Sequence, residues 1–236
     1  MTPVIKSNMT YIKLGDLRLE PDYSGALYAP DFETLIVADL HFEKASALYE
    51  KTGSAYPPFD TRDTLLRLGD AIDRQQPKRI IFLGDTWHDE FGFARMQNTD
   101  HQLIRTIRTR AETVFISGNH DTSASGSGGP KMVQEIKLGD VVLSHEPFED
   151  ANRYQICGHL HPVAKLMQKG RTIRRRCFFV SDKQCILPAM GALSGGLNCC
   201  DPVFDRFMSY ENRRVILLGR NRLFHLGMKT LLPDRS

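Results

Sequence analysis

Five short apolar runs, each followed at once by polar residues, constrain the fold of this chain more than any other feature of its sequence. The runs are rich in β-branched residues and nearly continuous in their hydrophobicity, which is typical of strands buried on both faces of a sheet. They are TLIVADL (34–40), RIIFLGD (79–85), TVFISGN (113–119), VVLSHEP (141–147) and YQICGHL (154–160).

Helical segments lie between some of these runs. The stretch DTRDTLLRLGDAIDRQQP (60–77) predicts a helix with Asp60 as its N-cap and Pro77 at its end. Its apolar residues, broadly on one side, are Leu65, Leu66, Leu68, Ala71 and Ile72. A second helix is predicted within 99–112, and two further strands within 172–193 around a Ser-Asp-Lys turn. This alternation indicates one layered α/β domain over residues 1–236.

Composition places the chain among ordinary globular proteins, with 41% apolar and 25% charged residues. We expect a cytoplasmic location and no membrane association. No segment approaches the roughly 20 apolar residues that span a bilayer, and MTPVIKSNMTYIKLGD at the start lacks the apolar core of a signal peptide.

The net charge of +3 does not identify a nucleic-acid binder by itself. The five cysteines show no CxxC spacing, so neither a disulfide framework nor a zinc ribbon is indicated.

Polar residues gather at the ends of the predicted strands. Five of the eight histidines follow a strand directly, where the loops of an α/β fold converge on one crevice. Glycines at 84, 118 and 158 are consistent with tight turns that bring short side chains into this crevice. The polar set is Asp39, His41, Asp85, Asn119, His120, Asp121, His145, His159 and His161.

Without His120 and Asp121, this set offers two carboxylates, one amide oxygen and four imidazoles. Such donors suit first-row divalent ions, with Mn²⁺, Fe²⁺ and Zn²⁺ as the candidates, and the lack of thiolates argues against a structural zinc site. Seven ligands are too many for one ion with an open position, and suit two ions that share a bridging carboxylate. Two such ions can activate a water and bind both reacting oxygens of a phosphate ester.

The blocks DLH, GD, GNHD, SH and GHLH, in this order, resemble the calcineurin-like metallophosphoesterase superfamily. The resemblance implies a four-layer metallophosphatase fold, in which two mixed β-sheets pack face to face and are flanked by helices. It implies that one ion is held by Asp39, His41 and His161, that Asp85 bridges, and that Asn119, His145 and His159 hold the second ion. His120 would be the general acid or transition-state stabiliser, and Asp121 would orient it.

Further blocks without metal-binding residues, among them PPFDTRDTLLRL, RRRCF, LPAMGALSGGL and LLGRNRLF, resemble a narrower group. This group is the PdeM family of bacterial ligase-associated DNA damage response endonucleases. The resemblance implies hydrolysis of DNA phosphodiesters in repair, by attack of a metal-bridging hydroxide, with Mn²⁺ as the expected cofactor. It implies DNA as a partner and an ATP-dependent DNA ligase, a helicase and a nuclease-like protein as associated components.

Three features leave alternatives open. His88 lies in GDTWHDE, where many members of the superfamily have GDxxD or GDxxE. It is either a loop residue that does not touch metal, or a residue that supports the metal ligands or contacts the substrate. Arg174, Arg175 and Arg176 either contact substrate phosphates or form a solvated strand face or a salt-bridge network. The segment TSASGSGGP (122–130) is either a plain surface loop or a mobile flap.

Two other functions compete with a DNA endonuclease. A small-molecule phosphoesterase, acting on cyclic nucleotides or phosphomonoesters, would use the same centre in an enclosed pocket rather than an open groove with basic walls. A non-catalytic repair scaffold would have lost metal ligands, whereas every expected ligand is present here. The sequence does not indicate the oligomeric state.

Overall fold

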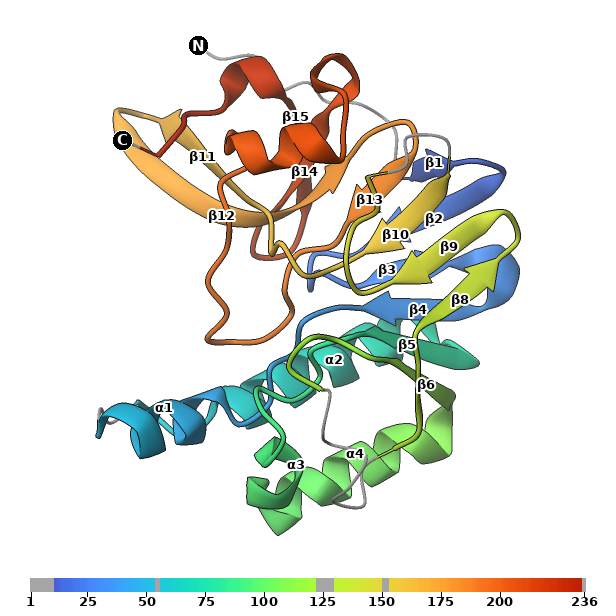
Figure 1. Cartoon of the computed structure of the whole chain (residues 1–236), viewed down its shortest axis with the longest axis vertical. Helices are drawn as coiled ribbons and strands as arrows, with labels where there is room; N and C mark the ends of the chain where they lie inside the picture. The colour runs from blue at the N-terminus through green and yellow to red at the C-terminus, as the bar shows by residue number, and fades with distance from the viewer. Residues whose placement is uncertain (1–10, 54–55, 122–129, 150–152, 235–236) are drawn as a thin grey trace.

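The computed structural model describes residues 11–53, 56–121, 130–149 and 153–234. Two mixed β-sheets face each other across the middle of the molecule, with helices on the outer side of one of them (Figure 1). Nearly all of the 122–130 segment lies outside the described residues. Within the part of the chain that is described, no helix is both long and apolar enough to cross a membrane.

The first sheet contains the first three apolar runs, which form β4, β5 and β6. Its strand order is β1-β2-β3-β4-β5-β6-β7, antiparallel from β1 to β4 and parallel from β4 to β7. The strands are β1 (Ile12–Leu14), β2 (Leu17–Pro21), β3 (Leu27–Ala29), β4 (Thr34–Val37), β5 (Arg79–Leu83), β6 (Glu112–Ile116) and β7 (Met132–Val133).

The second sheet contains the other two runs, which form β9 and β10. Its order is β15-β14-β12-β13-β10-β9-β8, with β11 paired to β12, and only β13, β10 and β9 run parallel. The strands are β8 (Glu135–Leu138), β9 (Val141–Ser144), β10 (Tyr154–Cys157), β11 (Val163–Gln168), β12 (Arg171–Val180), β13 (Gln184–Ile186), β14 (Arg214–Leu218) and β15 (Leu223–Gly227). The hairpin predicted around the Ser-Asp-Lys turn is β12–β13.

Alternate residues of each strand fill the space between the sheets. Ile36 and Ile81 of the first sheet and Leu143, Ile156 and Phe178 of the second belong to one fully buried apolar cluster. Their chain neighbours point outward, because successive side chains of a strand face opposite sides of its sheet. Both faces of β4 and β5 are therefore apolar, which explains the nearly continuous hydrophobicity of these runs.

Helices cover the outer face of the first sheet, where Leu35 and Phe82 pack against Leu65, Ile72 and Ile107. The helices are α1 (Lys44–Thr52), α2 (Asp60–Gln75), α3 (Gly92–Arg95) and α4 (Asn98–Arg110), and a 3₁₀ turn, η1 (Pro30–Phe32), precedes β4. Short 3₁₀ turns and loops cover the outer face of the second sheet instead. These turns are η3 (Pro202–Arg206), η4 (Tyr210–Asn212) and η5 (Met228–Thr230).

Helix α2 corrects two details of the sequence interpretation. Asp60 is the first helical residue, Phe59 occupies the cap position, and the Asp60 carboxylate accepts a hydrogen bond from the backbone N–H of Ala45 at 3.1 Å. The acid therefore holds the start of α1 rather than capping its own helix. Leu66 is 54% exposed, because α2 buries the side that carries Leu65 and Leu68.

Leu65 and Leu66 make a matched pair for testing this packing. Leu65 is 2% exposed, so we expect Leu65→Ala to lower the free energy of unfolding by about 2–5 kcal/mol, the range for a leucine removed from a core. Leu66→Ala should change it by no more than about 0.5 kcal/mol, as for other surface substitutions. Urea denaturation of both variants measures the difference, and similar losses would contradict the assigned face of α2.

Candidate metal centre

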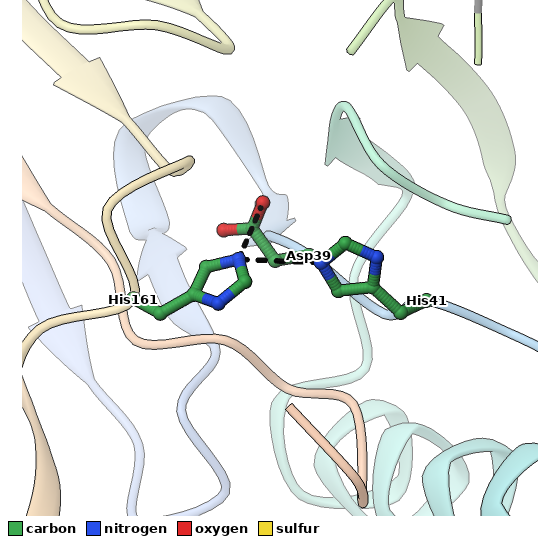
Figure 2. Close-up of side chains that lie close together, drawn as sticks. All are labelled: Asp39, His41 and His161. Atoms are coloured by element: carbon green, nitrogen blue, oxygen red, sulfur yellow. Dashed lines mark hydrogen bonds and ion pairs between the residues drawn. The ribbon is translucent and has the colours of Figure 1, made fainter. Parts of the chain in front are cut away.

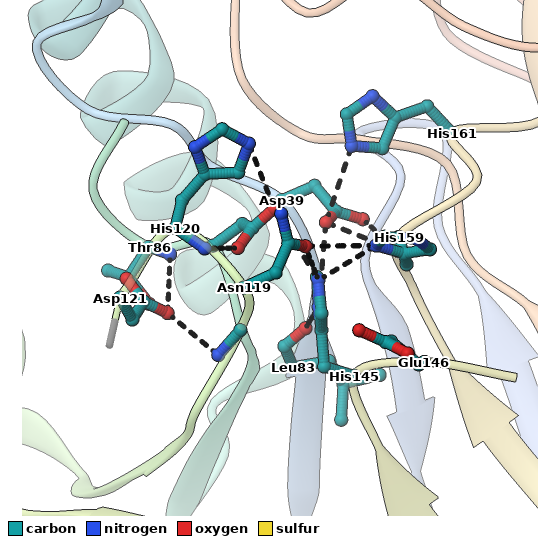
Figure 3. A network of polar contacts seen from close by, with 12 residues as sticks. Asp39, Leu83, Thr86, Asn119, His120, Asp121, His145, Glu146, His159 and His161 are labelled. Carbon is teal, nitrogen blue, oxygen red and sulfur yellow. Dashed lines mark hydrogen bonds and ion pairs between the residues drawn. The ribbon is translucent and has the colours of Figure 1, made fainter. Parts of the chain in front are cut away.

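The polar residues predicted to form a site converge at one end of the two sheets. Asp39 and His41 follow β4, Asp85 follows β5, and Asn119 to Asp121 follow β6. His145 follows β9, and His159 and His161 follow β10 in the other sheet. Because β4, β5 and β6 run parallel, as do β9 and β10, the ends of these strands meet at the same place. Figure 3 shows the side chains of Asp39, Asn119, His145, His159 and His161 pointing toward one another.

One group of ligand atoms consists of Asp39, His41 and His161 (Figure 2). Nε2 of His161 lies 3.3 Å from Oδ1 of Asp39 and 3.3 Å from Nε2 of His41. Burial lowers the pKa of His41 to about 2, despite the nearby carboxylate of Asp85. His41 is therefore a neutral imidazole, the form that binds metal ions.

A second group consists of Asn119, His145 and His159. Oδ1 of Asn119 lies 3.0 Å from Nε2 of His145 and 3.0 Å from Nδ1 of His159, and these two nitrogens are 3.2 Å apart. Nδ1 of His145 donates a hydrogen bond to the Leu83 carbonyl at 2.8 Å. This bond fixes the ring and directs its Nε2 into the group, as commonly seen for metal-binding histidines.

Asp85 lies between the two groups. Its Oδ2 is 3.9 Å from Nε2 of His41 in the first group and 3.4 Å from Nε2 of His145 in the second. The backbone N–H of His120 donates to Oδ1 at 2.9 Å and holds the carboxylate in place. Asp85 thus has an oxygen close to ligand nitrogens of both groups, which is the position expected for a bridging ligand.

The spacing of these donor atoms fits divalent ions. Ligand atoms about 2.1 Å from one ion lie about 3.0 Å apart at an angle of 90° and about 3.4 Å apart at the tetrahedral angle. The separations given above within the two groups, and that from Asp85 to His145, fall between 3.0 and 3.4 Å, whereas Asp85 and His41 are 3.9 Å apart. The donors are oxygen and imidazole nitrogen alone, a mixture that suits first-row divalent ions.

The electrostatic environment also favours positive charge. Burial would raise the pKa of Asp85, but its hydrogen bond to His145 and the charge of His145 hold that pKa well below its ordinary range. Burial would lower the pKa of His145, yet Asp85 and Asp39 raise it to about 9. The negative charge that favours a proton on His145 favours a bound cation equally.

The backbone of these residues is strained in a way that the sequence did not indicate. Nine described residues other than glycine have positive φ, and five of them belong to the predicted ligand set. They are Asp39 (φ 53°), His41 (46°), Asp85 (46°), His159 (69°) and His161 (46°). Such conformations cost on the order of 1–3 kcal/mol each and collect at functional sites, where the surrounding structure maintains them.

Two of the predicted glycines leave the space that the carboxylates occupy. A Cβ atom on Gly118 would collide with Oδ1 and the backbone nitrogen of Asp85, and one on Gly158 would collide with Oδ2 of Asp39. Neither glycine has a positive φ among the described residues. These positions therefore require glycine for its small size, because any side chain would push a carboxylate out of the site.

His120 and His88 lie beside the ligand atoms. Nε2 of His120 is 4.0 Å from Oδ2 of Asp85, and its side chain is 40% exposed. The His88 ring stacks on the His120 ring, with centroids 5.3 Å apart and planes inclined by 20°, and it meets the His41 ring edge-on at 5.6 Å. His88 is therefore a loop residue that lies against the predicted site.

Asp121 has a different contact from the one expected. Its carboxylate accepts hydrogen bonds from the backbone N–H groups of Thr86, Trp87 and Gly118 at 3.1–3.3 Å. No hydrogen bond between Asp121 and the His120 ring is found in the described residues. The buried carboxylate ties the loop after β5 to the loop after β6 (Figure 3). That Asp121 orients His120 stays a prediction.

Arg176, one of the three arginines predicted to contact substrate, also has another role. Its guanidinium is mostly buried and donates to the carbonyls of Met190, Gly191, Ala192 and Ser194 at 2.6–3.4 Å. Burial, with a smaller effect from Arg67, lowers its pKa to about 10. Arg176 therefore anchors the loop after β13, while Arg174 and Arg175 are exposed.

No family profile and no curated protein sequence matches the chain. Among solved structures, the Pseudomonas putida nuclease MPE is similar over 92% of this chain and 98% of its own, with 27% identity and a TM-score of 0.70. A phosphoesterase from E. coli, Yfce, is similar at 12% identity over 84% of this chain and 96% of its own, with a TM-score of 0.39. Vps29 from Entamoeba histolytica, complexed with Zn²⁺, has 12% identity, coverages of 82% and 96%, and a TM-score of 0.35.

These findings agree with the layered architecture described above. The chain has the metallophosphatase fold, with two mixed sheets packed face to face. The similarity to the nuclease and the clustered aspartates and histidines support the calcineurin-like metallophosphoesterase superfamily and a divalent metal site. They do not single out the PdeM family within it.

Gly118 offers a test of the site that leaves every predicted ligand unchanged. We expect Gly118→Ala to displace Asp85 and to weaken Mn²⁺ binding at least tenfold, because a methyl group would occupy the place of the carboxylate oxygen. Gly195→Ala is the control, since nothing lies within 4 Å of a Cβ built there. Titration of metal-free protein with Mn²⁺ measures both affinities, and equal values would contradict the tight fit of Asp85.

Proposed function

We propose that this protein is a dimetal-dependent phosphodiesterase that cleaves DNA, as the sequence resemblance to the PdeM family implies. The observation that carries the proposal is the pair of ligand groups that share Asp85 at the ends of the strands. A nuclease with a similar fold over 92% of this chain supports a nucleic acid as the substrate.

In this proposal Asp39, His41 and His161 hold one ion, and Asn119, His145 and His159 hold the other. Asp85 reaches both positions. When bound there, two divalent ions supply a water of lowered pKa and the positive charge that neutralises the phosphate oxygens. We propose Mn²⁺ as the native metal, because three carboxylate and amide oxygen donors accompany the imidazoles.

His120 provides the proton for the leaving oxygen in this scheme. Its ring is partly exposed, so a substrate at the ligand atoms can touch it, and its Nε2 lies 4.0 Å from Oδ2 of Asp85. Stacking of the His88 ring on the His120 ring restricts the orientation of His120. A positioned imidazolium of this kind is an efficient donor to an alkoxide leaving group.

A small-molecule phosphoesterase is the second candidate function. A cavity of about 550 Å³ adjoins the second ligand group, and its walls include Asn119, Gln134, Glu135, His145 and Glu146. This volume lies within the range of small-ligand pockets. The size of this cavity beside the ligand group is the observation that favours a cyclic nucleotide or a phosphomonoester.

The role in repair belongs to the same proposal. We propose a cytoplasmic enzyme that works with an ATP-dependent DNA ligase, a helicase and a nuclease-like protein, and the sequence resemblance supports this assignment.

The substrate is tested by comparing kcat/KM in the presence of Mn²⁺ for single-stranded, duplex and nicked DNA, RNA, a cyclic nucleotide and an aryl phosphomonoester. We expect DNA to be cleaved internally, and Asp85→Asn to reduce activity at least a thousandfold because both ion positions lose a ligand. Turnover of the monoester without any cleavage of nucleic acid would overturn the endonuclease proposal. Full activity in Asp85→Asn would overturn the dimetal mechanism.

The role of His120 is tested separately with two leaving groups. In His120→Gln we expect Mn²⁺ binding to persist and turnover of DNA, which has an alkoxide leaving group, to fall by roughly 10² to 10⁴, the usual range for general acid catalysis. An activated aryl diester needs little protonation and should lose much less. Equal losses on both substrates would show that His120 does not act as a proton donor.

A further inference from the structure

An arginine-rich cavity of about 470 Å³ lies outside the group of predicted metal ligands. Its walls come from α2, β12, the turn between β14 and β15, and the turn at Tyr23 and Ser24. None of the seven predicted ligands lines it. Its charged wall residues, among those that the structure describes, are Arg67, Arg74, Arg174, Arg175, Arg176 and Arg220, with Asp70 as the single acid.

Most of this positive charge has no acidic partner. Arg74 is neutralised by two hydrogen bonds to Asp22, at 2.8 and 3.0 Å, and Arg174 has a carboxylate, that of Asp234, 3.6 Å away. Arg175 and Arg220 are exposed and form no ion pair with any described residue. A concave wall with this excess of one charge attracts ions of the opposite sign.

Among the described residues, the two more buried arginines of the cavity donate hydrogen bonds only to backbone oxygen. Arg67 donates to the Met190 carbonyl at 2.7 Å, and Arg176 donates to the Gly191 carbonyl at 2.6 Å. Burial lowers the pKa of both guanidinium groups. Burial of a cation is unfavourable, Asp63 offsets it only in part for Arg67, and an anion in the cavity would offset it further.

The cavity is separated from the predicted metal centre by a single stretch of backbone. The N–H of Met190 donates to the carbonyl of Ala38 at 2.9 Å, and the N–H of Gly191 donates to that of Asp39 at 3.1 Å. The carbonyls of the same two residues face the arginines of the cavity. Residues 190–191 therefore bind the segment that carries Asp39 through their N–H groups, and the arginines of the cavity through their carbonyls.

We propose that this cavity is a second phosphate-binding site, which holds the backbone of a polynucleotide whose scissile bond lies at the metal centre. The identity of the strand rests on the proposed function. All six cations are arginines, whose planar guanidinium binds phosphate through two parallel hydrogen bonds. Such contacts position a strand without reading its sequence.

The experiment measures binding of a fluorescein-labelled single-stranded 30-mer to metal-free protein by anisotropy, over a range of salt concentrations. The test variant is Arg175→Ala with Arg220→Ala, because neither side chain has an ion pair to lose. The control is Arg105→Ala, an exposed arginine on α4 outside the cavity. Asp70→Asn provides a change in the opposite direction, since it removes the single acid of the cavity wall.

We expect the double variant to bind the 30-mer about tenfold or more weakly. The slope of log K against log salt should fall by about 1.4, because each lost phosphate contact on a single strand contributes about 0.7. Asp70→Asn should bind more tightly than wild type, and Arg105→Ala should match it. With Mn²⁺, the double variant should raise KM for the 30-mer and leave kcat/KM for bis(p-nitrophenyl) phosphate unchanged, because that diester is too small to reach both places.

Other results would overturn the phosphate-binding site or, separately, the endonuclease proposal. Unchanged affinity and salt slope in the double variant would exclude strand binding in the cavity, even if wild type cleaves DNA normally. Stabilisation of wild type by AMP that is lost in the double variant, with unchanged 30-mer binding, would reassign the cavity to a free nucleotide. If wild type fails to cleave DNA but still binds the 30-mer through these arginines, the endonuclease proposal fails and the binding site stands.

Discussion

The site depends on one interaction, the placement of the Asp85 carboxylate between two groups of ligand atoms. This buried carboxylate is held by the backbone N–H of His120 and lies against Nε2 of His145. Its own backbone adopts φ 46°, and Gly118 lacks the side chain that would displace it. The positive φ costs stability, whereas the contacts with His120 and His145 lower the pKa of Asp85 and keep its carboxylate charged. A buried, charged carboxylate in this position suits a site that binds positive charge.

The face-to-face packing of the two sheets is what assembles the two ligand groups. Asp39, Asp85 and Asn119 follow strands of the first sheet, whereas His145, His159 and His161 follow strands of the second. Neither sheet alone provides all the donors of either group. The apolar cluster between the sheets, with Ile36, Ile81 and Phe178, is therefore also the support of the metal centre. Metal binding and folding of this chain should be thermodynamically coupled for the same reason.

The sequence predicted those parts of the structure that depend on local pattern. Runs such as RIIFLGD showed both the strand and the polar residue at its end, because strands buried on two faces are continuous in their hydrophobicity. Contacts between segments that are distant in the sequence could not be predicted from local pattern. Examples are the hydrogen bonds of Asp121 to the backbone at 86–87 and those of Arg176 to the loop at 190–194. The arginine cavity joins α2, β12 and the β14–β15 turn, and only the β12 arginines are adjacent in sequence. Positive φ at five ligands has no sequence signal, because aspartate and histidine favour it only weakly.

The contacts of Arg67 and Arg176 suggest that the arginine cavity also supports the metal centre. Both guanidinium groups bind the loop whose N–H groups hold the carbonyls of Ala38 and Asp39. Asp39 sits directly after β4 with a strained backbone, so movement of this loop would be transmitted to the first ligand group. An anion that tightens the two arginines would stiffen the loop as well. Substitution of Arg67 or Arg176 would therefore weaken phosphate binding and disturb the positions of the metal ligands at the same time. Arg175 and Arg220, which have no contact with the loop among the described residues, separate the two effects.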